Sequence, residues 1–313
     1  MTGPRLVPLA EAYLALRRKL GFVLLKDSQR LLSFARYRDG IGHSGPLTTE
    51  LAVQWARLPK TDNPTYWAIR LDVIRRFARH LRLLDPQTEI PPQGLLGPSC
   101  RRREPHIYSD IEITALLGAA AKLQPADGLR PRTFTCLYGL LACTGLRISE
   151  ALRLKRPHAD LTTGVLTIVE TKFSKSRLVP LHPSATRALK AYAEMRDCYF
   201  PLAHAQEFFL TDPGIPLKYK AVRQTFAELR HCLGWVGVAG RRPPRIHDLR
   251  HTFACRRLLA WYQEGADVDL KVPALSTYLG HVGVSSTYWY FTAVPDLMAT
   301  AAARFEQAVG TPR

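Results

Sequence analysis

Residues 245–259 read Arg-Ile-His-Asp-Leu-Arg-His-Thr-Phe-Ala-Cys-Arg-Arg-Leu-Leu, and they are the most informative part of the chain. Apolar residues recur in them at helical spacing, which predicts an amphipathic helix. His247 and Arg250 are three residues apart and therefore share one face of that helix. An imidazole beside a guanidinium can bind a phosphate, because arginine offers a planar set of donors and histidine exchanges a proton near neutral pH. Such a pair is more often an ordinary surface feature, so its meaning depends on the rest of the chain.

The composition indicates a folded protein with an anionic partner. The chain has 313 residues, of which 46% are hydrophobic, enough for one large or two modest domains with real cores. Lysine and arginine number 44 against 26 acidic residues, which gives a formal net charge of +18. The basic residues are spread over the whole chain and form no tail. This distribution favours nucleic acid as the polyanion over an anionic membrane surface.

Cysteine usage and hydropathy argue against two other classes of protein. The six cysteines form no CxxC pair and have no histidine at zinc spacing, so we expect no zinc finger. No apolar run approaches the roughly 18 residues that a membrane helix needs. The first residues lack the apolar segment of a signal peptide. These features predict a soluble, cytoplasmic protein without a zinc finger.

The chain divides into three parts by composition. Residues 1–90 have helical periodicity, and residues 91–106 are rich in proline and arginine, which is typical of a linker. Residues 107–313 form the second domain. The first domain contains a strongly basic helix over 65–83, with Arg70, Arg75, Arg76, Arg79 and Arg82. These arginines could belong to a solvated surface or to a DNA clamp, and their density favours contact with phosphates.

The second domain is predicted to be mostly helical. A nearly all-apolar helix over 132–143 should lie at its centre, and the Gly145 that follows suits the residue after a helix C-terminus. Because another helix begins at once, Arg147 lies at a helix junction on a buried stem, where its charge must have a partner. We expect Glu150 to pair with a local arginine and to take no part in catalysis. A last helix with one apolar face is expected over 295–309.

One β-hairpin is expected in this domain, which makes the fold α+β. Residues 164–169 and 177–181 are two short β-rich segments on either side of a polar turn. The turn carries Lys172 and Lys175. For a hairpin considered alone, a solvated basic turn is the simpler interpretation.

Five separated motifs then occur in a fixed order: Thr144-Gly-Leu-Arg-Ile-Ser-Glu150, Lys172 before Arg177-Leu-Val-Pro-Leu181, His247-Asp-Leu-Arg-His251, Leu279-Gly-His281 and Tyr290. This set resembles the tyrosine recombinase family, also called the phage integrase family, over residues 107 to about 295. The first hundred residues resemble the helical core-binding domain of these enzymes only by position and helical character.

The resemblance implies six catalytic residues: Arg147, Lys172, His247, Arg250, His281 and Tyr290. The two arginines would clamp the scissile phosphate, His247 would accept the proton of the nucleophile, and the hairpin lysine would protonate the leaving oxygen. The nucleophile is expected nine residues after His281, which selects Tyr290, with Tyr288 as the rival register. The segment 260–277 is several residues longer than the family pattern, which indicates a loop insertion.

The resemblance also implies the reaction and its partners. The enzyme would cut and rejoin double-stranded DNA through a 3′-phosphotyrosine, without metal or nucleotide cofactor, as a homotetramer on two sites, with or without helper proteins. An integrase or transposase of a mobile element is the expected type. Further phosphate contacts are expected from a set of basic residues: Lys175, Arg177, Arg241, Arg242 and Arg245.

Two alternatives stay open at this stage. The chain could be a DNA-binding protein of the same fold without activity, although none of the six expected residues is missing. It could also be a type IB topoisomerase, which uses similar chemistry without a partner site. The short helical first domain and the Leu-Gly-His motif favour the recombinase.

Overall fold

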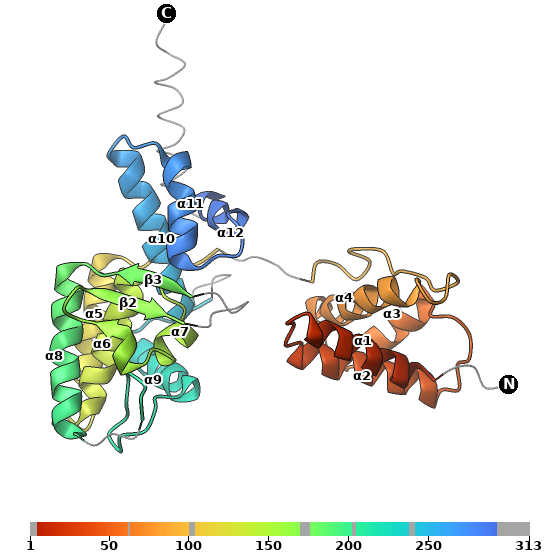
Figure 1. Ribbon diagram of the computed structural model, residues 1–313, viewed down its shortest axis with the longest axis horizontal. Coiled ribbons are helices and arrows are strands. Elements are labelled where there is room, and N and C mark those ends of the chain that lie inside the picture. Colours follow the sequence, from red (N-terminus) through yellow and green to blue (C-terminus); the bar gives the residue numbers. More distant parts are fainter. Residues whose placement is uncertain are drawn as a thin grey trace, which may run out of the picture. The chain divides into compact units, whose positions relative to one another are not determined.

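The computed structural model describes residues 5–61, 63–99, 104–169, 176–201, 205–237 and 242–292. The chain folds as two compact units, Met1–Arg103 and Glu104–Arg313, each with its own hydrophobic core (Figure 1). In the described part of the chain, no helix has both the length and the apolar character needed to cross a bilayer.

The first unit is built from four helices: α1 (Leu6–Lys19), α2 (Leu25–Gly40), α3 (Thr49–Arg57) and α4 (Pro64–Leu81). Its core is formed by large apolar side chains with little or no exposure, among them Phe34, Trp55 and Phe77. The predicted basic helix is α4, but its arginines do not act alike. Arg70 and Arg75 are buried, and the Arg70 guanidinium lies 3.6 Å from the Trp55 ring centroid.

Residues 91–99, which are part of the linker predicted over 91–106, pack on the first unit. The buried Arg75 donates from Nε to the carbonyl of Pro91 and from Nη2 to that of Pro92, each at 2.7 Å. Leu96 is buried in the core of the first unit. A buried guanidinium needs acceptors, and these proline carbonyls supply them. The segment therefore packs on the first unit.

The second unit opens with α5 (Asp110–Ala121), α6 (Leu129–Thr144) and α7 (Ile148–Leu152). A three-stranded antiparallel sheet follows, with β1 (Ala159–Asp160), β2 (Val165–Ile168) and β3 (Arg177–Pro180) in that order. Leu166 lies opposite Val179 in the β2–β3 pair, and both point into the core. The predicted hairpin is confirmed, and the short strand β1 was not foreseen.

The remaining helices are α8 (Pro183–Tyr199), α9 (Tyr219–Cys232), α10 (Ile246–Gln263), α11 (Val268–Leu279) and α12 (Ser285–Thr292). The predicted α+β class is therefore confirmed. The apolar helix α6 is central, as expected: it packs against α5, α8 and α10. The helix predicted over 295–309 lies outside the described residues.

Helix α10 joins two apolar clusters of the second unit. Ile246 and Leu249, near its start, belong to the main core around α6. Ala254 and Leu258, five and nine residues after Leu249, belong to a smaller cluster with α11 and α12. Figure 1 shows these three helices side by side. The side chains expected to carry the chemistry lie where the two clusters meet.

Candidate active site

Arg147 lies in the sharp connection between α6 and α7. Helix α6 ends at Thr144, and Gly145 follows with φ of +63°, a conformation that ends the helix and turns the chain. The Arg147 guanidinium donates from Nη1 to Oε1 of Glu150 at 2.7 Å and from Nη2 to the carbonyl of Gly280 at 2.9 Å. Its half-buried side chain is thus held from two sides by residues far apart in the sequence.

Arg250 is the most deeply buried cation of the site, with 3% of its surface exposed. It donates from Nη1 to the carbonyl of Gly145 and from Nη2 to that of Leu279, each at 2.8 Å. Burial and the neighbouring Arg147 lower the pKa of Arg250 to about 10, so it stays charged at neutral pH. Among the described residues, its hydrogen-bond partners are these two main-chain carbonyls and the Tyr290 hydroxyl, with no carboxylate bonded to it directly.

The C-terminal end of α11 is the common anchor of these arginines. The last carbonyls of a helix have no partner within it and carry partial negative charge. Gly280 follows α11 with φ of +68°, which turns the chain and leaves these carbonyls accessible. Three guanidiniums from three elements donate to three successive carbonyls: Arg177 to Tyr278, Arg250 to Leu279 and Arg147 to Gly280.

Glu150 lies between two of these cations, with 2% of its side chain exposed. Its Oε1 accepts from Nη1 of Arg147 and from Nη1 of Arg177, and its Oε2 accepts from the Arg147 backbone N–H and from Nη2 of Arg177. Burial raises the pKa of Glu150, but Arg177 and Arg147 together hold it below its usual range. The predicted pairing of this carboxylate with a local arginine is confirmed.

Arg177, which was expected to contact DNA, is instead buried within the protein. Its side chain is 8% exposed and is directed at Glu150 and at the end of α11. A buried guanidinium whose three nitrogens all donate within the protein has little left to offer a phosphate. This geometry disfavours the expected phosphate contact, and basic character near a hairpin tip does not reveal a buried partner on α7.

His247 is exposed at the start of α10, on the side of the helix that Arg250 shares. Loss of water around its ring and the Arg250 charge lower the pKa of His247 below its usual range. The ring is therefore neutral at physiological pH and can accept a proton. Its ring and that of His251 are nearly perpendicular, with centroids 4.8 Å apart.

Tyr290 is buried among these groups, with 2% of its surface exposed. Its ring is stacked on His281, with centroids 6.0 Å apart and an interplanar angle of 25°. Burial raises the pKa of Tyr290, while Arg250 beside its hydroxyl opposes that rise. Tyr288, the rival nucleophile, is 45% exposed and its hydroxyl donates to Asp269 at 3.5 Å. The structure therefore brings Tyr290, and not Tyr288, to the arginines.

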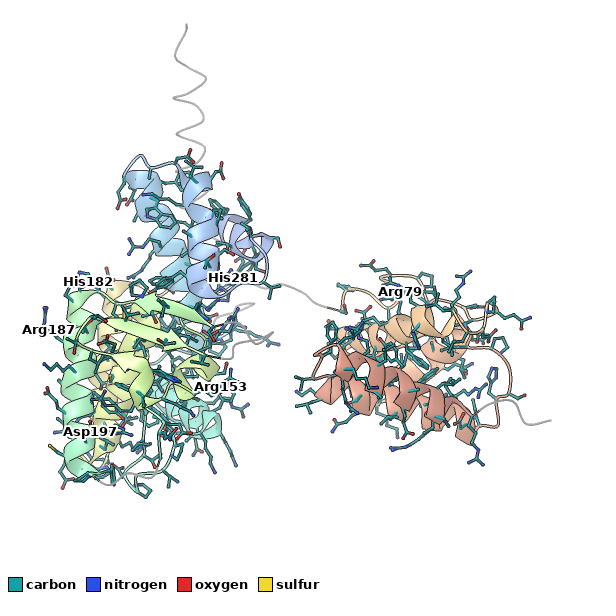
Figure 2. The ribbon with its side chains drawn as sticks, in the orientation of Figure 1. Arg79, Arg153, His182, Arg187, Asp197 and His281 are labelled. Atoms are coloured by element: carbon teal, nitrogen blue, oxygen red, sulfur yellow. The ribbon has the colours of Figure 1, made fainter. Side chains whose placement is uncertain are left out.

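His281 lies in the turn between α11 and α12, where Figure 2 labels it. Its Nδ1 is 2.7 Å from the Oγ1 of Thr287, a residue with no exposed surface. Burial and the charges of Arg250 and Arg147 lower the pKa of His281 to about 3. A neutral imidazole in a fixed orientation is thus placed beside the tyrosine.

His251 was not expected at the site. It is buried between α10 and α12, with ring centroids 5.4 Å from Tyr290 and 5.1 Å from Trp289. Within the described residues its Nδ1 has no hydrogen-bond partner, and burial lowers its pKa to about 3. Its position directly after Arg250 in the sequence could have indicated that it lies near the site.

The other predicted phosphate contacts are placed only in part. Lys172, one of the six expected catalytic residues, lies outside the described residues, as do Lys175 and Arg241. Arg242 is exposed in the loop before α10. Arg245 is about half exposed and donates to both carboxylate oxygens of Asp248, at 3.2 and 2.7 Å.

Comparison with known proteins agrees with this geometry. Residues 109–295 match the phage integrase family. The chain is 40% identical over 301 residues to "Putative integrase/recombinase y4rB" of Sinorhizobium fredii, which covers 95% of this chain and 96% of the relative. It is 31% identical over 231 residues to tyrosine recombinase XerD of Caulobacter vibrioides, which covers 73% of this chain and 70% of the relative.

Two solved structures have the same fold. The integrase of transposon Tn1549, in complex with a circular intermediate DNA, superposes with a TM-score of 0.68 at 16% identity, covering 96% of this chain and 99% of that one. The XerH site-specific recombinase, bound to a palindromic difH substrate, has a TM-score of 0.66 at 18% identity, covering 89% and 78%. The chain belongs to the phage integrase family and is a tyrosine-type site-specific recombinase.

Proposed function

We propose that this recombinase cuts and rejoins double-stranded DNA with Tyr290 as its nucleophile. The observation that carries the proposal is the meeting of Arg147, His247, Arg250, His281 and Tyr290, from four separate segments, around one small volume. The hydroxyl of Tyr290 would attack the phosphorus and displace the 5′ oxygen of the next nucleotide. A 3′-phosphotyrosine and a free 5′ hydroxyl would result.

The charge of the site suits that reaction. Among the described residues, three guanidiniums and one carboxylate meet here and give a net formal charge of +2. A phosphodiester carries one negative charge, and a second develops when the tyrosine oxygen adds. Fixed donors aimed at developing charge are a large part of enzymatic rate enhancement, and losing one costs roughly 2.7–4 kcal/mol in comparable anion holes.

Two residues are proposed to transfer protons. His247 would take the proton of the Tyr290 hydroxyl, because its lowered pKa keeps it neutral and ready to act as a base. Lys172 would give a proton to the departing 5′ oxygen, a role proposed from the family resemblance alone. Because the phosphotyrosine keeps the energy of the phosphodiester, the free 5′ hydroxyl of another strand can attack it without an external energy source.

DNA would be held by basic residues of both units. In the second unit we propose Lys175, Arg241, Arg242 and Arg245. On α4 and directly after it in the first unit, Arg76, Arg79 (Figure 2) and Arg82 are exposed. Neutralising one phosphate contact should weaken DNA binding at all sequences and reduce its dependence on salt.

The mobile-element role and the assembly are also proposals. One relative carries the word integrase in its name, and one solved structure with the same fold is that of a transposon integrase. We propose a homotetramer on two DNA sites, with strands exchanged in pairs. Mass measurement of the purified protein with DNA carrying one or two sites would test it, and a complex of fixed monomeric stoichiometry on both DNAs would argue against it.

Covalent capture tests the central proposal. Wild type, Tyr290→Phe and Tyr288→Phe are incubated with a nicked, partly randomised duplex library and run on a denaturing gel. We expect an adduct from wild type and Tyr288→Phe and none from Tyr290→Phe. No adduct from any of them, despite tight DNA binding, would favour an inactive DNA-binding protein. Relaxation of a supercoiled plasmid without strand exchange would favour a topoisomerase.

A further inference from the structure

The buried pair of Arg177 and Glu150 is not explained by phosphate binding. Every nitrogen of the Arg177 guanidinium is engaged: Nε donates to the carbonyl of Tyr278 at 2.7 Å, Nη1 to Oε1 of Glu150 at 3.2 Å and Nη2 to Oε2 of Glu150 at 2.9 Å. Both side chains are almost wholly buried. Such a pair must have a function other than contact with DNA.

The second partner of Glu150 suggests that function. The same two carboxylate oxygens accept from Arg147, one from its side chain at 2.7 Å and one from its backbone N–H at 3.0 Å. One buried anion is therefore shared by two cations on opposite sides. Opposite charges attract more strongly when water is excluded, so removing one cation strengthens the hold of the anion on the other.

We infer that Arg177 is a positioning residue that keeps Glu150 from neutralising Arg147. With Arg177 present, half of the carboxylate's hydrogen bonds are satisfied from β3, and the Arg147 guanidinium keeps charge for a phosphate. Without Arg177, Glu150 binds Arg147 alone, and the formal charge of the described cluster falls from +2 to +1. This inference rests on the proposed role of Arg147 in binding the scissile phosphate.

If the role of Arg177 is purely structural, a different result is expected. Arg177 also touches the end of α11, because a Cβ at Gly280 would lie 2.6 Å from its Nη1. If Arg177 only fastened β3 to α11, removing Glu150 as well would weaken the site further. If Arg177 balances the charge of Glu150, removing that charge should restore part of the activity. The double substitution therefore separates the two roles.

The test measures the rate of covalent adduct formation at saturating nicked DNA, and the dissociation constant of the noncovalent complex formed by Tyr290→Phe versions. The variants are Arg177→Met, Arg177→Lys, Glu150→Gln and Arg177→Met with Glu150→Gln. The control is Arg187→Met, which removes the same charge from α8 on the outside of the unit (Figure 2). Melting temperatures confirm that each variant is folded.

Arg177→Met is expected to slow the adduct about 100-fold, the size of losing one anion-binding donor, with a less than about threefold change in DNA affinity. Glu150→Gln added to it should recover about tenfold of that loss. Arg177→Lys, which keeps a cation beside Glu150, should lie closer to wild type than Arg177→Met. Arg187→Met should leave the rate unchanged.

Two results would overturn the inference. The double variant could be as slow as Arg177→Met or slower, or Arg177→Met could lose DNA affinity while keeping its rate. If Arg177→Met does not fold, Arg177→Gln, which removes the charge but keeps a polar side chain, is compared alone and with Glu150→Gln for the same decision. Failure of the proposed function is distinguishable, because wild type would then form no adduct that Tyr290→Phe abolishes.

Discussion

Replacing Gly280 by alanine tests whether the end of α11 sets the position of the arginines. Gly280 has φ of +68°, where a side chain costs roughly 1–2 kcal/mol. Its new Cβ would stand 2.6 Å from Nη1 and 2.8 Å from Cζ of Arg177, closer than such atoms can approach. The guanidinium of Arg177 or the carbonyl of Gly280 must therefore move, and that carbonyl is the acceptor for Arg147.

Gly234 provides a matched control. It also has φ of +68° and follows a helix, α9, but no atom lies within 4 Å of the position that a Cβ would take there. Gly234→Ala should therefore lose roughly 1–2 kcal/mol of stability through backbone strain alone. Gly280→Ala should lose that amount and, in addition, the alignment of one phosphate-binding arginine, which corresponds to roughly 10²–10³-fold in rate.

The assay is single-turnover adduct formation on nicked DNA, with melting temperature measured in parallel. We expect both variants to melt earlier than wild type by similar amounts, and only Gly280→Ala to be slow. Equal rates in the two variants would show that the carbonyls of α11 do not determine the position of the arginines. A slow Gly234→Ala would mean that lost stability, and not lost alignment, explains the result.

Three further outcomes are expected. The pKa of His251 is near 6.5 in the unfolded chain and about 3 in the folded protein, so its contribution to the free energy of unfolding is complete above pH 6.5 and is lost as pH drops toward 3. Melting curves of His251→Phe should therefore show a smaller loss of stability over this pH range than those of wild type. Thr287→Val, which removes the partner of His281, should slow the adduct about tenfold while Thr287→Ser does not, as adduct rates will show. Arg75→Met should destabilise the first unit by roughly 1–3 kcal/mol in urea unfolding, since two proline carbonyls at 91–92 lose their donor; an unchanged midpoint would contradict this.

Local spacing predicts which of the candidate site residues share a helix face or follow the end of a helix. His247 and Arg250 share a helix face, and Gly280 ends a helix directly before His281. The choice of Tyr290 over Tyr288 came from the family resemblance, which implies a nucleophile nine residues after His281. A few neighbouring residues are enough to predict these local features, and the family resemblance supplied the roles of the residues and the order of the motifs.

The partners of those residues could not be predicted, because they are long-range. Arg177 and Glu150 are 27 residues apart and pair across β3 and α7. Likewise, Arg75 meets its carbonyl acceptors 16 and 17 residues later, in a segment that composition alone marks as a linker. Sequence reveals that a residue is basic, but whether its charge faces solvent or a buried acceptor depends on tertiary packing.

The anchoring of three arginines by the main chain of α11 has an evolutionary consequence. Carbonyl oxygens are present whatever side chain a residue carries, so no exchange of side chain at 278 or 279 deletes an acceptor. The anchor can be damaged mainly through the backbone conformation, and that dependence is concentrated in Gly280. Relatives can therefore diverge widely along this helix and still hold their arginines in one arrangement, provided that the glycine after it is retained.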